Sequence, residues 1–336
     1  MSDVVIVSAV RTAVGTPVGA LAPLGAGGLG DAAVRAAISR AGLAAEMVDA
    51  VLFADEIGAP NTAATPGGGL RSLMRAADRL ASGDVEVVVA AARGAGPTDG
   101  DDDRTDALAA VEAIARRCDL TRVELESFAL TSRLRVAAAA RAGRFVDEIV
   151  PVGSGAISVD HDETIRQPTD PRVLPDPRPA APGAAKTSIE ALAPTALGGA
   201  ALVLTRADIA RRRGLPILAR LVATAEAEAS TIPEAAIAGA ARAAARSLRW
   251  DLDGIDLVEI DEISAAHALT AWRDLGIELA RINVLGGALG LGGPSGASDL
   301  RMVVTLLHEL RRRDLRTGLA SGDDGGVGRA VCVERI

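Results

Sequence analysis

"IDLVEIDEI" (Ile255–Ile263) is a short apolar stretch that ends on Asp-Glu-Ile, and "VDAVLFADEI" (Val48–Ile57) ends on the same three residues. Short apolar runs rich in valine and isoleucine are typical of buried strands. A helix is predicted ahead of each run, over Gly27–Gly42 and over Pro233–Leu248. The same helix–strand unit in both halves of the chain indicates an internal duplication.

The other predicted elements continue this order in each half. In the first half they are the strands Asp3–Val10 and Val85–Ala92 and the helix Gly69–Gly83. In the second half they are the strands Leu218–Ala227 and Gly328–Arg335 and the helix Ser298–Arg313. Strands that alternate with helices at this spacing predict an α/β fold in which helices cover both faces of the sheet.

A segment between the two halves breaks the pattern. It contains an acidic tip, "TDGDDDRTD", two amphipathic helices and the proline-rich run "PTDPRVLPDPRPAAP". We expect the acidic tip to be a solvated surface loop. The predicted domains are therefore a first half of residues 1–93 plus 187–214, an inserted loop region of residues 94–186, and a second half of residues 215–336.

Composition restricts the function. The 336 residues carry a net charge of −8 and include three Phe, two Trp and no Tyr, so the core must pack through small side chains. An acidic chain without a long basic run and with hardly any aromatic residues to stack on bases is not expected to bind nucleic acid. No signal peptide and no membrane-spanning segment are predicted from the sequence. Two cysteines suit a reducing cytoplasm without disulfides.

The glycine-rich run "GGALGLGGPSGASDLR" (Gly286–Arg301) precedes a predicted helix. Its spacing fits neither a dinucleotide-binding Gly-x-Gly-x-x-Gly turn nor a phosphate loop with lysine. Close backbone packing and a helix N-terminus explain it better. Ser295 and Ser298 are the natural N-cap residues for the helix that follows.

Cysteine and histidine positions offer no obvious catalytic pair or metal site. Cys118 at the end of a helix and Cys332 inside the last strand are expected to be small packed side chains. His267 and His308 lie in the middle of predicted helices. His161 stands between two aspartates, but neighbouring residues alone rarely supply metal geometry, so no metal is predicted.

Several segments together resemble the thiolases, the acyl-CoA acyltransferases that make or break β-ketoacyl-CoA. They are "VIVSAVRTAVGTPVGAL" (Val5–Leu21), "ELESFALTSRLRVAAAARAGRFVDEIVPV" (Glu124–Val152), "DLVEIDEISAAHAL" (Asp256–Leu269), the glycine-rich run and "GDDGGVGRAVCVERI" (Gly322–Ile336). The resemblance implies a thiolase-like fold, with two duplicated mixed-sheet halves in αβαβα layers and a shortened inserted loop domain. It also implies CoA or acyl-CoA as a possible ligand and no other cofactor.

The family's reaction uses a nucleophilic cysteine, an activating histidine, a second cysteine and an asparagine that positions a water. In this sequence Pro66, Gly293, Gly322 and Asp261 stand at the matching positions, and the family's glutamate is kept as Glu262. Proline supplies neither a nucleophile nor a backbone N–H. Classical thiolase activity is therefore predicted to be absent.

Two segments of this chain are shorter than the corresponding segments of the thiolases. The chain is much shorter than thiolases between the strand Val48–Ile57 and "PGGGL", where the family has a helix and an interface strand. The insert is also curtailed after "AAARGAGP", where the family has a segment that contributes to the acyl-CoA pocket and to tetramer contacts. The resemblance therefore does not extend to the segments that form the family's subunit contacts.

Three functions remain open. In the first, the chain is a non-catalytic subunit or binding module with a protein partner, such as an active acyl-CoA enzyme. In the second, it is an acyl-CoA acyltransferase or C–C lyase that uses Asp261 and Glu262 as catalytic residues, at the carboxyl end of a strand where α/β sheets gather ligands. These carboxylates could instead only hold a neighbouring loop. In the third, the chain merely binds CoA or an acyl carrier.

Overall fold

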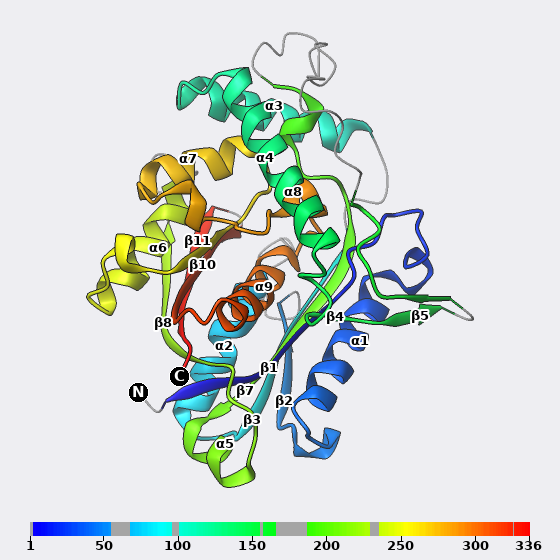
Figure 1. Ribbon diagram of the computed structural model, residues 1–336, viewed down its shortest axis with the longest axis vertical. Coiled ribbons are helices and arrows are strands. Elements are labelled where there is room, and N and C mark those ends of the chain that lie inside the picture. Colours follow the sequence, from blue (N-terminus) through cyan, green and yellow to red (C-terminus); the bar gives the residue numbers. More distant parts are fainter. Residues whose placement is uncertain are drawn as a thin grey trace, which may run out of the picture.

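The structure is a computed structural model that describes residues 3–54, 68–95, 101–154, 157–165, 187–228, 235–324 and 326–336 (Figure 1). Within these residues nine strands form one sheet in the order β2-β3-β7-β1-β8-β11-β10-β9, with β4 beside β1. The strands of the first half are β1 (Val4–Thr12), β2 (Ala50–Phe53), β3 (Val87–Ala95) and β7 (Leu197–Arg206). Those of the second half are β8 (Ala219–Glu228), β9 (Leu257–Ile260), β10 (Thr317–Asp324) and β11 (Val327–Glu334).

The two halves of the sheet have the same pairing pattern. In the first, β2 and β3 are parallel, while β3–β7 and β7–β1 are antiparallel. In the second, β9 and β10 are parallel, while β10–β11 and β11–β8 are antiparallel. The halves meet where β1 pairs with β8, through Val5 opposite Arg220 and Ile6 opposite Ala219. This repeated pattern confirms the predicted duplication.

Helices lie in three layers around the sheet halves (Figure 1). Helices α2 (Gly69–Ser82) and α9 (Ser298–Arg312) pack between the two halves, in one apolar cluster with the inner faces of both. Helix α1 (Gly25–Arg40) covers the outer face of the first half. Helices α6 (Ala235–Ser247) and α7 (Ala265–Leu275) cover the outer face of the second. The αβαβα layering is therefore as predicted.

Close packing of small residues brings helices against the sheet. A Cβ on Gly199 in β7 would lie 2.6 Å from the main-chain oxygen of Leu29 in α1. A Cβ on Gly328 in β11 would lie 2.0 Å from the main-chain oxygen of Ala236 in α6. Strand β7 corresponds to β11, and α1 to α6, so each half has a glycine at the same helix–sheet contact.

The insert contributes α3 (Asp101–Arg117), α4 (Arg122–Arg141), β4 (Ile149–Val150) and a hairpin of β5 (Val152–Ser154) and β6 (Ile157–Val159). A capping box of Thr121 and Glu124 starts α4. Because α3 begins at Asp101, the prediction that the acidic tip is a loop was wrong for its second part. Acidic residues favour the first turn of a helix, where they face the positive end of its dipole.

Strands β7 and β10 were not predicted, because their glycines and polar residues weaken the apolar pattern of "LGGAALVLTR" and "TGLASGDD". The short strands β4, β5 and β6 of the insert were not predicted either. The N-cap prediction for α9 was also wrong. The N-cap residue is Ala297, and Ser298 Oγ donates to the main-chain oxygen of Pro294 at 3.3 Å.

The short helices are α5 (Ala207–Arg213) and α8 (Ala288–Leu291), with 3-10 turns at Ala22–Leu24, Ala45–Met47, Ile189–Ala191, Leu252–Gly254 and Leu279–Arg281. No helix in the described ranges is long and apolar enough to cross a membrane.

Candidate functional site

The two predicted carboxylates follow β9 directly, at its carboxyl end. Asp261 and Glu262 are both buried, and α7 begins three residues later, with Ser264 as its N-cap. Successive residues of an extended chain point to opposite sides. Accordingly Glu262 contacts α4 and α8, whereas Asp261 lies beside β10 and α9.

Glu262 is held by three hydrogen-bond donors. Ser132 Oγ and the Leu289 N–H donate to Oε2 at 2.6 and 3.1 Å. Asn283 Nδ2 donates to Oε1 at 2.7 Å. These contacts tie the glycine-rich run to α4 and leave this carboxylate little freedom. They are the contacts expected of a residue that holds a neighbouring loop.

Asp261 has a different environment. Its side chain is only 5% exposed, and Oδ1 has no hydrogen-bond partner. Burial, and then the negative charge of Asp299, raise the pKa of Asp261 to about 7, against the opposing effects of Arg301 and the Glu262 N–H. A carboxyl group with such a pKa exchanges its proton near neutral pH, as an acid–base catalyst must.

The structure brings Gly322 next to Asp261. A Cβ on Gly322, in β10, would lie 3.6 Å from the Asp261 Cβ and 3.3 Å from the Asp299 Cβ. The position that resembles the family's second cysteine therefore faces two aspartates. Pro66, at the position that resembles the nucleophile, lies outside the described residues.

Gly293 lies in the bend before α9. Its N–H donates to the Pro194 main-chain oxygen at 2.8 Å, and an added Cβ would lie 3.3 Å from the Ala193 Cβ and 3.8 Å from Ser298 Oγ. Ser298 begins the helix that also carries Asp299. Gly293 and Gly322 thus both lie next to the N-terminal turn of α9.

Sequence reasoning missed Asp299, which caps a helix of the other half. The N–H groups of Gly69 and Leu70, in the first turn of α2, donate to Asp299 Oδ1 and Oδ2 at 2.6 and 3.0 Å. A helix N-terminus is a natural anion site because its first N–H groups have no partner within the helix. Here the chain's own carboxylate fills that site. The glycines of "PGGGL" signal an uncapped helix start, but no local pattern identifies so distant a partner.

The chain has only two cysteines, and both thiols are buried or partly buried. Cys332 lies inside β11, opposite Leu319 and Ala223, and burial raises its pKa to about 12. Cys118 follows α3 and packs against the apolar cluster under α6 and α7. Within the described part of the chain, neither thiol hydrogen bonds an imidazole.

The three histidines lie on separate elements. His308 Nε2 contacts the Ala9 main-chain oxygen at 3.0 Å, and burial lowers the pKa of His308. His267 Nδ1 pairs with Ser264 Oγ at 2.8 Å. His161 is exposed beside Asp160. No three potential metal ligands converge among the residues that the structure describes.

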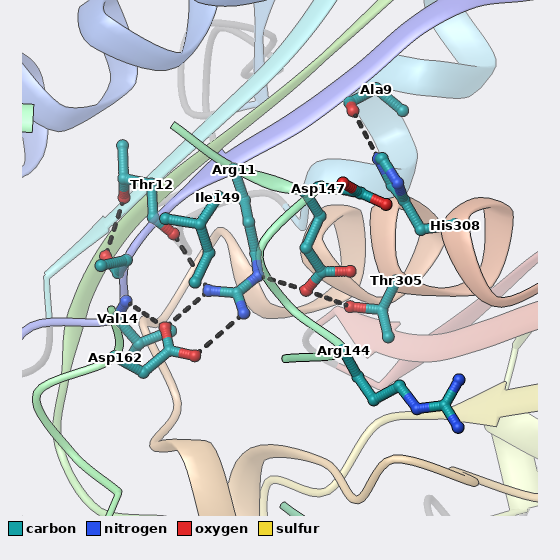
Figure 2. A network of polar contacts seen from close by, with 12 residues as sticks. Ala9, Arg11, Thr12, Val14, Arg144, Asp147, Ile149, Asp162, Thr305 and His308 are labelled. Atoms are coloured by element: carbon teal, nitrogen blue, oxygen red, sulfur yellow. Dashed lines mark hydrogen bonds and ion pairs between the residues drawn. The ribbon is translucent and has the colours of Figure 1, made fainter. Parts of the chain in front are cut away.

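A second buried cluster surrounds Arg11 of β1 (Figure 2). Arg11 Nε donates to Glu148 Oε1 at 2.6 Å, and Nη1 and Nη2 donate to the two oxygens of Asp162 at 2.6 and 2.9 Å. Thr305 Oγ1 in α9 donates to the same Glu148 oxygen at 3.1 Å. Burial opposes the charge, but the two carboxylates raise the pKa of Arg11 above its usual value. One ionised residue thus joins β1, the insert and α9. No sequence pattern had singled it out.

Comparisons with known proteins agree with this architecture. The family model of the thiolase N-terminal domain matches residues 99–208, and that of the thiolase C-terminal domain matches residues 215–335. The chain is 36% identical to the acetyl-CoA acetyltransferase of Rhizobium meliloti, with 99% of both chains covered. That alignment runs over 392 positions, and this chain has 336 residues, so the relative carries segments that are absent here.

Solved structures give the same result. Human mitochondrial 3-ketoacyl-CoA thiolase has a TM-score of 0.88 at 26% identity, with 99% of each chain covered. The acetyl-CoA acetyltransferase of Syntrophomonas wolfei has a TM-score of 0.89 at 25% identity, with both chains covered completely. These likenesses confirm the predicted thiolase-like fold. Together with the matching family models and relatives, they show that the chain belongs to the thiolase family.

Proposed function

We propose that this chain is a thiolase-family protein without thiolase catalysis, which acts in acyl-CoA metabolism as a non-catalytic subunit or as a module that binds acyl-CoA or a partner. The relatives named acetyl-CoA acetyltransferase support the link to acyl-CoA. The departures from the family's reactive residues support the absence of catalysis.

One observation carries the proposal. The chain has two thiols in total, and the more buried one, Cys332, has a pKa raised to about 12 inside a strand. Because the thiolate is the attacking species, such a thiol is inert near neutral pH. The positions that resemble the second cysteine and the histidine are the glycines Gly322 and Gly293. A carboxylate at Asp261 would repel the oxyanion that the family's asparagine helps to stabilise.

The test is a thiolase assay on the purified chain, in both directions: condensation of acetyl-CoA and thiolysis of acetoacetyl-CoA. We expect no turnover above the blank, while the Cupriavidus necator acetyl-CoA acetyltransferase, 34% identical, serves as the positive control. Turnover that Cys332→Ala or Cys118→Ala abolishes would contradict the proposal. Calorimetry with CoA and acetyl-CoA then separates an acyl-CoA-binding module from a purely partner-binding one.

A partner-binding role predicts a stable heteromer in the cytoplasm, where two free thiols remain reduced. Native mass spectrometry of the protein isolated from its own cells should show a second, different chain, with an active acyl-CoA enzyme as the expected partner. A lone monomer or a homodimer would count against this role.

Asp261 favours a second candidate function, an acyl-CoA acyltransferase or C–C lyase with a carboxyl acid–base group. Its free Oδ1 and its pKa of about 7 are suited to proton transfer. If turnover of any acyl-CoA is found, Asp261→Asn should abolish it. Glu262→Gln should mainly lower stability, because its contacts are those of a residue that positions a loop. Activity that persists in both variants would exclude this candidate.

A further inference from the structure

Two buried carboxyl groups, one in β9 and one directly after it, face the central helix layer. Leu257 belongs to the apolar cluster around α2 and α9, whereas Val258 and Ile260 belong to the cluster on the outer face of the sheet. Successive side chains of a strand point to opposite faces, so Glu259 and Asp261 share the side of Leu257. Both are almost fully buried, and Glu259 Oε2 and Asp261 Oδ1 accept no hydrogen bond from the described residues.

One buried arginine acts on both carboxyl groups. Arg301 of α9 is within electrostatic reach of the pair, and its positive charge favours their ionised forms against the effect of burial. Arg135 of α4 also acts on Glu259, but its guanidinium donates to three main-chain oxygens. The other charged groups that act on the pair are acidic and favour the protonated forms, namely Glu262 after β9, Glu148 of the insert, and Asp299 and Glu309 of α9.

The surrounding carboxylates have partners of their own. These are Arg11 for Glu148, Arg312 and Arg313 for Glu309, three hydrogen-bond donors for Glu262, and the α2 N–H groups for Asp299. Arg301 is therefore left to balance Glu259 and Asp261. Burial is the largest of the effects that raise the pKa of Glu259 to about 8 and that of Asp261 to about 7. Because the two groups share one cation, they titrate together, and their last proton leaves only above neutral pH.

The charge of this pair acts on the contact between α2 and α9. A Cβ on Gly322 would lie 3.6 Å from the Asp261 Cβ and 3.3 Å from the Asp299 Cβ, so both aspartates lie against the same glycine. Asp299 in turn accepts the N–H groups of Gly69 and Leu70 in the first turn of α2. Uncompensated negative charge at Asp261 repels Asp299 strongly, because little water screens a buried pair.

We propose that Glu259, Asp261 and Arg301 form a proton switch for the contact between α2 and α9. While the two carboxyl groups hold one proton, Arg301 balances the remaining charge and Asp299 caps α2. When that proton leaves, excess negative charge remains beside Asp299, and the first turn of α2 separates from it. Because α2 belongs to the first half of the chain and α9 to the second, the switch makes their contact depend on pH. It does not depend on whether the chain catalyses a reaction.

The test measures amide hydrogen exchange by NMR at about pH 6 and about pH 8.5, on either side of the proposed proton loss. Protection is the exchange rate of a free amide divided by the measured rate, which removes the intrinsic effect of pH. We expect the protection of the Gly69 and Leu70 amides to fall by at least about tenfold at the higher pH, the equivalent of one pKa unit of coupling. Unchanged protection of these two amides would overturn the proposal.

The Val14 amide is the internal control for global unfolding. It donates to Asp162, a buried carboxylate whose charge is balanced by Arg11. Its protection should stay the same at both pH values, because no titrating carboxyl group is invoked there. An equal fall at Val14 and at Gly69 would show that the whole chain loosens, and would overturn the proposal of a local switch.

Two variants remove one carboxyl group each. In Asp261→Asn and in Glu259→Gln the protection of the α2 amides should persist at the higher pH, because Arg301 then balances the single carboxylate that is left. Asp78→Asn, on the exposed side of α2, is the matched control and should respond to pH as the natural chain does. A pH effect of natural size in Asp261→Asn would contradict the proposal.

Infrared spectroscopy of the natural chain keeps the test decisive if a variant does not fold. The carbonyl stretch of a buried, protonated carboxyl group should be present at about pH 6 and lost at about pH 8.5, with the same midpoint as the loss of protection. The absence of this band at the lower pH, or its persistence at the higher pH, would overturn the proposal.

Discussion

Three buried carboxylates near the end of β9 differ in the hydrogen bonds that they accept. Glu262 accepts three hydrogen bonds, and Asp299 accepts the N–H groups of another helix, whereas Asp261 Oδ1 accepts none. Of the three, Asp261 has a raised pKa, chiefly because of its burial and the charge of Asp299. The three residues are therefore not interchangeable, although all are acidic and buried.

Asp299→Asn should lower the free energy of unfolding by about 1–3 kcal/mol, because an amide loses the charge and turns one acceptor into a donor facing an N–H. Urea unfolding measures the loss. Asp78→Asn is the matched control, since Asp78 is exposed on α2. Equal losses in the two variants would show that Asp299 does not cap α2.

Asp261 should make the chain less stable as the pH rises. Its pKa is higher in the folded state, about 7 against an ordinary 3.8, so the folded state binds the extra proton between these values. Stability from this group is complete below the ordinary value and is lost as the pH rises through about 7. The slope reaches at most about 1.4 kcal/mol per pH unit. Relative to Asp261→Asn, the natural chain should therefore lose stability across this window, as urea titrations at several pH values would show. Parallel profiles would contradict this prediction.

At the scale of elements, the duplication extends to single glycines. Gly199 lets α1 approach β7, and Gly328 lets α6 approach β11, because in both cases a Cβ would collide with helix backbone. Helix backbone cannot shift without moving the whole helix, so these contacts demand glycine. The chain has few aromatic residues, and α6 is rich in alanine. These small side chains also allow helices and strands to pack closely.

Gly199→Ala and Gly328→Ala should each destabilise the chain by about 1–3 kcal/mol or more, because the added methyl group overpacks the helix–sheet contact. Gly27→Ala in α1 is the control. A Cβ there meets nothing within 4 Å, and alanine favours the helix, so stability should stay the same or rise by about 0.5–1 kcal/mol. Thermal unfolding would rank the three variants, and a Gly199→Ala variant as stable as Gly27→Ala would contradict the packing argument.

At the scale of the whole molecule, the buried cluster of Arg11 links parts that lie far apart in the sequence. Arg11 belongs to β1, Glu148 and Asp162 to the insert, and Thr305 to α9 (Figure 2). The cluster therefore makes the position of the insert depend on both sheet halves.

Arg11→Met should lower the free energy of unfolding by about 3–5 kcal/mol, because it leaves two buried carboxylates without their cation. Combining it with Asp162→Asn should recover part of the loss, since one of those charges is then removed. Arg242→Met, which breaks an exposed pair with Asp274, should cost less than about 1 kcal/mol. Denaturant unfolding of the three variants and the natural chain checks this, and an Arg11→Met variant as stable as Arg242→Met would contradict it.

Much of the fold could be predicted because it rests on local patterns. Valine-rich runs marked β1, β3 and β9, and amphipathic periods marked α2, α4 and α9. Strands β7 and β10 were not predicted because glycine, serine and aspartate interrupt their apolar patterns. Pairing with the neighbouring strands of the sheet is what holds these segments in the extended conformation. At the candidate site, the position of Asp261 and Glu262 after a strand was predictable, but their different partners were not. The assignments of Pro66, Gly293 and Gly322 stay predictions.

The sequence by itself determined the α/β class, the duplication, the membership of the family and the residue types available for chemistry. The class and the duplication follow from periodicity and composition, which act between neighbours along the chain, whereas the family follows from the resemblance of whole motifs. Only the tertiary structure decided that Asp299 caps α2 and that Arg11 is neutralised by the insert. Burial and charge pairing depend on which distant residues meet, and no local pattern of residues contains that information.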